Sequence, residues 1–88
     1  MIEKEITVSN QLGIHARPAS LIVQTASRFK ASLSIVKDGV PADAKSIMSV
    51  MMLAAAFNSK VILRSDGPDE KDALAAIEEV FAKKFNEE

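Results

Sequence analysis

Residues 69–85 read DEKDALAAIEEVFAKKF and carry the clearest structural pattern of the chain. Its apolar residues recur at the 3.6-residue period that is typical of one face of a helix, and they are Ala73, Leu74, Ile77, Val80, Phe81 and Phe85. Asp69 stands where a helix cap is expected, acidic residues follow, and lysines stand near the end, as the helix dipole favours. A solvated acidic face is expected from Glu78, Glu79, Glu87 and Glu88. The stretch therefore predicts an amphipathic helix that must bury its apolar face against other elements.

Strands are predicted upstream of this helix, because apolar and polar residues alternate there with a period of two. The alternation occurs in four places, which are residues 2–8, Leu33 with Ile35, Val40–Asp43, and Val61 with Leu63. Asp38-Gly39 separates the second place from the third and is a strong signal for a hairpin turn.

Two further helices are expected between the strands. Apolar residues from Ala19 to Phe29 recur at helical spacing. Ser46 is expected to cap a short helix over Ile47–Leu53, and Asn58, which tolerates left-handed backbone angles, is expected to stop it. The order strand, helix, strand, strand, helix, strand, helix predicts an α+β fold, with helices on one face of a sheet and solvent on the other.

Composition excludes several classes of protein. Hydrophobic residues make up 48% and charged residues 26%, which suits one compact domain over residues 1–88. The net charge of -1 gives no field to attract nucleic acid or anionic lipid, and the absence of cysteine excludes disulfides and thiolate metal sites. No signal peptide and no apolar run of about 20 residues is present, so we expect a cytoplasmic protein without a membrane span.

The only histidine of the chain lies where the first strand gives way to the first helix. It belongs to the segment GIHARPAS, residues 13–20. Pro18 suits a first helical turn, where its missing N–H costs nothing, so His15 is expected at or just before the helix start. Backbone amides and the helix dipole favour an anion at that place. Arg17 adds a guanidinium group whose geometry matches phosphate oxygens, and no carboxylate lies nearby in the sequence.

This setting distinguishes four roles for His15. A metal site needs other His, Cys or carboxylate ligands, so it is poorly supported in a chain with one His and no Cys. A Ser-His-Asp hydrolase needs an acid to orient the imidazole, and none is local. A phosphoryl acceptor needs less, namely a neutral imidazole as nucleophile and cations that hold the phosphoryl oxygens. A histidine that only caps a helix in an interaction module stays open on the residues alone.

Three segments resemble one known family. Gly13–Ala19 closely resembles the active-site motif of HPr, the histidine-containing phosphocarrier of the phosphoenolpyruvate-dependent phosphotransferase system. KSIM, residues 45–48, resembles the regulatory-serine motif of the same family, and Asp69-Glu70 with the Ala-rich helix resembles its C-terminal helix. The resemblance covers essentially the whole chain.

The resemblance implies an open-faced β-sandwich in which four antiparallel strands are covered by three helices. It implies that His15 accepts phosphate from enzyme I through Nδ1, with Arg17 as phosphate partner, and passes it to an enzyme IIA domain for sugar uptake. It also implies phosphorylation of Ser46 by an ATP-dependent kinase. The chain is then expected to be a monomeric carrier without cofactor, not a free-standing enzyme. A Ser46 phosphorylase and a transcriptional regulator are further implied partners.

The second helix carries more apolar residues than one face can bury. We expect Val50 and Leu53 to face the core, while Ile47, Met48 and Met51 form an exposed patch beside the histidine. Methionine is flexible and suits several partners, and the resemblance implies that enzyme I and the acceptors dock there.

Three positions depart from the family pattern, and they are Asp43, Ser49 and Asn58-Ser59. Asp43 adds a like charge near a phosphate on Ser46, and Ser49 offers a competing hydroxyl, so both bear on kinase recognition. Two alternatives to a sugar-uptake carrier remain, a carrier of a nitrogen-related regulatory relay and an interaction module that is not phosphorylated.

Overall fold

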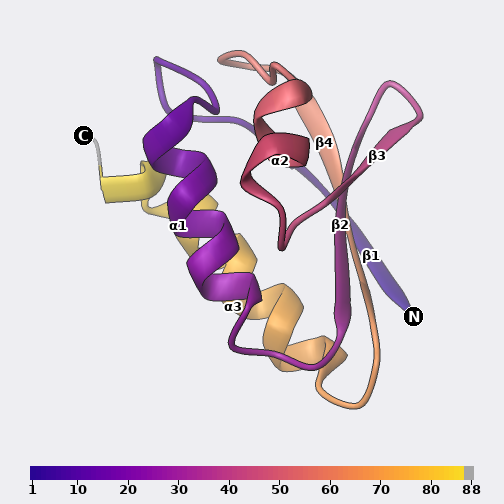
Figure 1. Ribbon diagram of the computed structural model, residues 1–88. Helices are drawn as coiled ribbons and strands as arrows, with labels where there is room; N and C mark the ends of the chain where they lie inside the picture. Colours follow the sequence, from indigo (N-terminus) through magenta and orange to yellow (C-terminus); the bar gives the residue numbers. More distant parts are fainter. Residues whose placement is uncertain (87–88) are drawn as a thin grey trace.

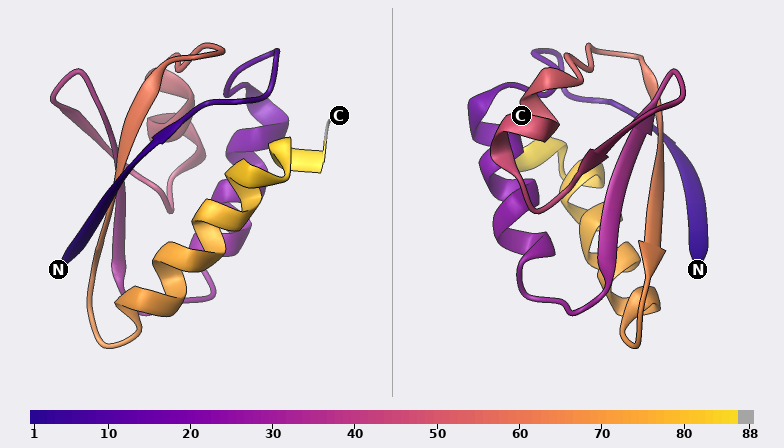
Figure 2. Two further views of the ribbon diagram at one scale, coloured as in Figure 1. Left: turned by 180° about the vertical axis from the view of Figure 1, so that it is seen from behind. Right: turned by 45° about the vertical axis from the view of Figure 1, so that its right-hand side comes forward.

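The computed structural model describes residues 1–86, so the acidic end expected at Glu87 and Glu88 lies outside the described residues. The elements follow the predicted order and are β1 (Ile2–Thr7), α1 (Ala16–Ala26), β2 (Ser32–Lys37), β3 (Val40–Asp43), α2 (Ile47–Met52), β4 (Lys60–Asp66), α3 (Glu70–Ala82) and a 3₁₀ turn, η1 (Lys84–Asn86). Figures 1 and 2 show the three α-helices on one side of a twisted sheet. The expected open-faced sandwich is confirmed.

The sheet is antiparallel throughout, with the strand order β1-β4-β2-β3. Ile35 of β2 lies opposite Leu63 of β4, and both side chains are buried on the face that the helices cover. On the other face Glu3 and Arg64 lie opposite each other and form an ion pair in solvent. That face is not wholly solvated, because Val36 is buried there opposite the half-buried Ile62.

The core lies between the sheet and the helices and is mainly aliphatic, with Phe81 and Phe85 as its buried aromatic residues. Its helical part comes from small and branched residues of α1 and α3, which are Ala19, Ile22, Ala26, Ala73, Leu74 and Ile77. Alanines on both helices let the helix backbones approach the sheet and each other closely. The hairpin turn at Asp38-Gly39 has positive φ at both residues, as its sequence predicts.

Two helices end differently from the prediction. α1 ends at Ala26, so Phe29 lies in the turn that follows, half-buried against the core, and not on the helix. α2 ends at Met52, and the first left-handed residue after it is Ala54, with a φ of 51°. Asn58 does adopt a left-handed φ of 69°, but it turns the chain into β4 instead of stopping α2.

The end of α3 also corrects the prediction. Phe85 is buried, as the helical period indicates, but it does not continue the helix, since Lys84, Phe85 and Asn86 all have positive φ. This left-handed turn brings the Phe85 ring back to the core, where its centroid lies 4.8 Å from that of Phe81 in an edge-to-face arrangement.

Asp69 has a different role from the one predicted. It occupies the N-cap position of α3, but its side chain does not cap that helix. Its carboxylate accepts hydrogen bonds from the backbone amides of Lys30 at 2.9 Å and Ala31 at 2.8 Å. These bonds lower the pKa of Asp69, the Lys30 amide contributing most, although burial opposes the shift. The carboxylate therefore joins the start of α3 to the turn between α1 and β2.

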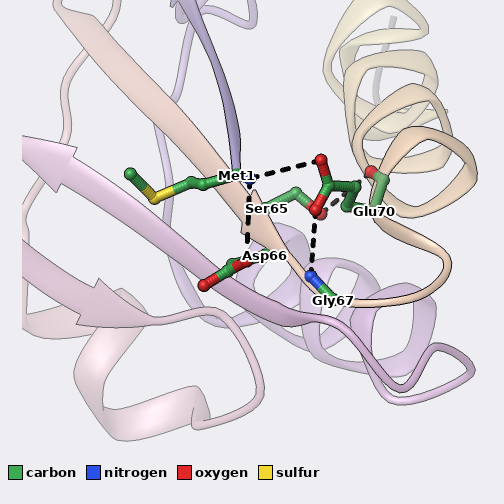
Figure 3. A network of polar contacts seen from close by, with 5 residues as sticks. All are labelled: Met1, Ser65, Asp66, Gly67 and Glu70. Carbon is green, nitrogen blue, oxygen red and sulfur yellow. Dashed lines mark hydrogen bonds and ion pairs between the residues drawn. The ribbon is translucent and has the colours of Figure 1, made fainter.

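A polar network closes the same end of the molecule (Figure 3). The amino group of Met1 lies 3.4 Å from the Glu70 carboxylate and 3.7 Å from that of Asp66. Glu70 also accepts the Gly67 amide at 3.1 Å, and its carbonyl accepts the Ser65 hydroxyl at 2.9 Å. The start of β1, the end of β4 and the start of α3 are thereby held together.

Candidate functional site

His15 is the N-cap residue of α1. Its backbone is extended, with a φ of -114° and a ψ of -162°, and its carbonyl accepts the amide of Ala19 at 3.0 Å. The side chain is half-buried. The predicted place at the helix start is confirmed, although the helix begins at Ala16, before the apolar pattern that starts at Ala19.

The first turn of α1 has a positive electrostatic character. Arg17 is the second helical residue and is exposed, while Pro18 is the third, is buried, and has no N–H to leave unsatisfied. The turn contains no acidic side chain. First-turn amides and the helix dipole add to the charge of Arg17, so an anion beside the imidazole would be stabilised.

A tight turn before His15 fixes where the helix begins. The Asn10 side chain is buried, and its amide donates to the carbonyl of Gly13 at 2.7 Å, while the Gly13 amide donates to the carbonyl of Asn10 at 3.1 Å. Gly13 has a φ of +69°, a conformation that costs residues with a Cβ atom. The histidine therefore follows a turn with few alternative conformations.

The same turn is packed against the segment that follows α2. The amide of Ile14 donates to the carbonyl of Ala55 at 2.8 Å. A Cβ atom on Gly13 would lie 2.6 Å from that carbonyl oxygen and 3.0 Å from the Cα of Ala56. In all three views of the fold (Figures 1 and 2), the loop before α1 and the end of α2 lie at the same end of the molecule. The structure thus places the end of α2 next to the turn that precedes His15.

Ser46 is the N-cap residue of α2, as the sequence predicts. Its hydroxyl accepts the Ser49 amide at 3.3 Å, and the residue is half-buried. The Asp43 carboxylate accepts the Lys45 amide at 2.9 Å, so its charge lies within the turn that leads to Ser46. Lys45 in turn donates from Nζ to the carbonyl of Phe29 at 2.9 Å.

His15 and Ser46 lie at opposite ends of α2. Ser46 precedes the helix, whereas Ala55, which holds the turn before His15, follows it. Six helical residues span about 9 Å. The two predicted phosphorylation positions therefore lie in different surroundings, and the short helix α2 connects them.

The apolar residues of α2 divide as the sequence predicts. Val50 and Leu53 are buried, while Ile47, Met48 and Met51 are 42%, 68% and 39% exposed. We call Ile47, Met48 and Met51 the α2 patch. Met51 lies three residues from Met48 and four from Ile47, so its side chain lies beside both on the surface of the helix.

Three of the other exposed apolar residues lie in α2 or in the loops beside it, and they were not predicted. Met52 is 80% exposed and continues the α2 patch, and Leu12 and Phe57 are exposed in the two segments that meet at the Ile14–Ala55 hydrogen bond. Leu12 lies between Gln11 and Gly13, and an apolar side chain in such a turn is a signal that could have found it.

The groups at the His15 helix start suit some kinds of chemistry better than others. Among residues 1–86, no three His, Cys, Asp or Glu side chains come together as a possible metal site. No helix in this part of the chain is long and apolar enough to cross a membrane. What the His15 helix start offers is an imidazole, a guanidinium group and a positive helix end, which suit a phosphoryl group.

Comparisons with known proteins agree on one family. A family model described as PTS HPr component phosphorylation site matches residues 2–83. The phosphocarrier protein HPr of Treponema pallidum is 51% identical over 88 residues and covers 100% of both chains. HPr of Xylella fastidiosa is 44% identical over 88 residues, or 100% of this chain and 99% of the relative. The crystal structure of HPr-C-His from Thermoanaerobacter tengcongensis gives a TM-score of 0.95 at 42% identity, covering 100% and 99% of the two chains.

An open-faced sandwich that presents one histidine at an electropositive helix start suits a carrier of phosphoryl groups. The full-length matches make the assignment specific. The chain belongs to the HPr family, the phosphocarrier component of the phosphotransferase system.

Proposed function

We propose that His15 accepts a phosphoryl group from enzyme I and passes it to an enzyme IIA domain. In the first step the lone pair of Nδ1 forms a bond to phosphorus while the bond between phosphorus and the donor atom of enzyme I breaks. In the second step a nucleophile of the acceptor attacks phosphorus, and the P–N bond to His15 breaks. The imidazole is restored, so the chain acts as a carrier.

The single observation that supports this proposal most is the place of His15 at the N-cap of α1. A phosphoryl group on this side chain lies beside a positive helix end. Arg17 stands in the first turn, where its guanidinium group can follow the phosphoryl oxygens during transfer. Both effects stabilise negative charge without a metal ion or cofactor.

The α2 patch is the proposed docking surface for both partners. It is apolar and exposed, and the Ile14–Ala55 hydrogen bond holds the His15 turn beside the end of α2. A partner that covers the patch therefore has its own phosphoryl donor or acceptor group brought close to the imidazole.

Ser46 is the proposed regulatory site. A phosphate there adds about two negative charges at the start of α2, where the helix dipole tolerates them, so the fold is retained. The same charges lie next to Ile47, the first residue of the α2 patch. Phosphorylation by an ATP-dependent kinase is then expected to repel an acidic partner from the patch and slow transfer to His15.

Incubation with enzyme I and labelled phosphoenolpyruvate tests the role of His15. The label should be stable in base and labile in acid, as a phosphoramidate is, and His15→Ala should carry none. Because the chain has only one histidine, this variant removes every imidazole. Label on His15→Ala would contradict the proposal.

Arg17→Ala tests the phosphate partner. Loss of a charge-assisted hydrogen bond of about 1.5 kcal/mol or more predicts transfer that is slower by about tenfold. Arg28→Ala is a matched control, because Arg28 lies beyond the other end of α1 and contacts the Phe29 ring. Equal rates for the two variants would remove Arg17 from the mechanism.

A further inference from the structure

Three methionines with exposed side chains lie on one short helix. Met48 and Met52 are 68% and 80% exposed and stand four residues apart, and the partly exposed Met51 lies between them. We call Met48, Met51 and Met52 the methionine cluster. Its members share one side of α2, whereas Val50 of the same helix is fully buried.

The methionine cluster holds most of the oxidisable sulfur of this protein. The chain has no cysteine and four methionines, so the only sulfur atom outside the cluster is that of Met1. Met1 is also exposed, but its amino group lies in the network with Asp66 and Glu70, at the opposite end of the molecule from the His15 turn. The chain therefore contains its own reference methionine.

We propose that the methionine cluster is a peroxide-sensitive modification site that reversibly weakens docking of the phosphoryl donor. Hydrogen peroxide transfers one oxygen atom to the thioether sulfur, which is oxidised by two electrons to the sulfoxide, and water leaves. The inference rests on the proposed function, because it assigns to oxidation an effect on the docking surface of the carrier.

The chemistry explains why oxidation acts on docking. A sulfoxide is polar and accepts strong hydrogen bonds from water, so a partner must remove that water to cover the α2 patch. Two members of the methionine cluster, Met48 and Met51, are also members of the α2 patch. Met52 continues the same surface, so oxidation changes the polarity of three of its four exposed side chains, the fourth being Ile47.

The fold itself is left intact by this modification. The sulfur atoms that react most readily are those of Met48 and Met52, whose side chains point largely into solvent. The core contacts of α2 come from Val50 and Leu53, and its first turn is capped by Ser46. A polar oxygen on an exposed side chain creates no buried unsatisfied group.

The experiment treats the full chain with hydrogen peroxide, removes the peroxide with catalase, and only then adds enzyme I and labelled phosphoenolpyruvate. Peptide mass spectrometry should find sulfoxide at Met48 and Met52 before Met51. The initial rate of phosphoryl transfer from enzyme I, measured at a limiting concentration of this protein, should fall about tenfold. This loss corresponds to about 1.4 kcal/mol of docking free energy. Circular dichroism and the unfolding midpoint should stay unchanged. The two sulfoxide reductases, one for each epimer, should restore the rate.

A triple variant, with Met48→Leu, Met51→Leu and Met52→Leu, provides the matched control. It keeps an apolar surface, cannot form sulfoxides there, and retains Met1, so peroxide should leave its transfer rate unchanged. A tenfold loss in this variant as well would overturn the proposal, and so would an oxidised natural chain that transfers at the untreated rate.

The proposed function is checked separately within the same experiment. Untreated chain that takes no label refutes the carrier role of His15 before any peroxide is used. A titration of His15→Ala with enzyme I, oxidised and reduced, measures docking without transfer. Weaker binding of the oxidised form supports the proposal whatever the fate of the label, and equal binding overturns it.

Discussion

The amide of Ile14 donates to the carbonyl of Ala55 at 2.8 Å, which joins the residue before His15 to the segment that follows α2. The two residues are far apart in the sequence, and their hydrogen bond sets the spacing between the helix start and the α2 patch. Changes in this contact should therefore affect phosphoryl transfer even where His15 and the patch are both intact.

Gly13→Ala is the most direct change in this contact. The added Cβ atom would lie 2.6 Å from the Ala55 carbonyl oxygen, and the residue would keep a φ of +69° only with strain. We expect a loss of about 1–3 kcal/mol in the free energy of unfolding. Transfer from enzyme I should slow as well, since the turn before His15 must shift. Chemical denaturation and the labelling assay measure the two effects.

Gly39→Ala is the control for this prediction. Gly39 also has a positive φ, of 80°, but a Cβ atom there would meet nothing within 4 Å. Its substitution should cost only the backbone strain and leave the transfer rate unchanged. If both variants lose the same stability and both transfer normally, the close packing of Gly13 on Ala55 has no consequence.

Ser46 should show two separable roles. Ser46→Ala removes the hydroxyl that accepts the Ser49 amide, and loss of an N-cap costs about 1 kcal/mol of unfolding free energy. Ser46→Asp keeps an acceptor at the N-cap and adds a negative charge that the helix start favours, so its stability should match or exceed that of Ser46→Ala.

The transfer rates of the two Ser46 variants should follow the opposite order. Ser46→Asp places charge beside the α2 patch and should slow acceptance of phosphate from enzyme I, while Ser46→Ala should transfer normally. A rate unchanged by Ser46→Asp would argue against regulation at this position, whatever its effect on stability.

Phe85 provides a test of the left-handed turn at the end of α3. Its ring is buried against Phe81, so Phe85→Ala should lower the free energy of unfolding by about 3–5 kcal/mol. Phe57→Ala is the matched control, because Phe57 is 48% exposed and should cost far less. Similar losses for the two variants, measured by urea denaturation, would mean that the turn does not hold Phe85 in the core.

The spacing of apolar residues and the capping residues predicted the helices and strands of this fold well. The alternation around Val61 and the cap at Ser46 are local signals, and the structure contains β4 and α2 at those places. What local signals could not reveal is which distant group takes a hydrogen bond. Asp69 has the sequence context of an N-cap, yet the amides of Lys30 and Ala31, brought near by the packing of α1 on α3, compete for its carboxylate.

The candidate site was predictable to a similar degree. The place of His15 follows from Pro18 and the strand before it, because both act on their immediate neighbours. Its closeness to the end of α2 depends on the contact between Ile14 and Ala55, which no local pattern indicates. Phe57 was missed for the same reason, since the exposure of a loop side chain depends on how two loops pack.

The Asp69 carboxylate should make the fold sensitive to acid. Its pKa is lowered in the folded chain, above all by the Lys30 amide, below the ordinary value of about 3.9 that it has in the unfolded chain. A lowered folded pKa means that the ionised carboxylate stabilises the fold above the unfolded pKa and that this stabilisation is lost as pH falls through the folded pKa.

Asp69→Asn should therefore be less stable than the natural chain near neutral pH, and the difference should shrink on acidification below about pH 4. Thermal unfolding across this range measures it. Asp72→Asn, which removes an exposed carboxylate from the same turn of α3, controls for helix charge, and a difference between Asp69→Asn and the natural chain that is constant with pH would contradict the assigned hydrogen bonds.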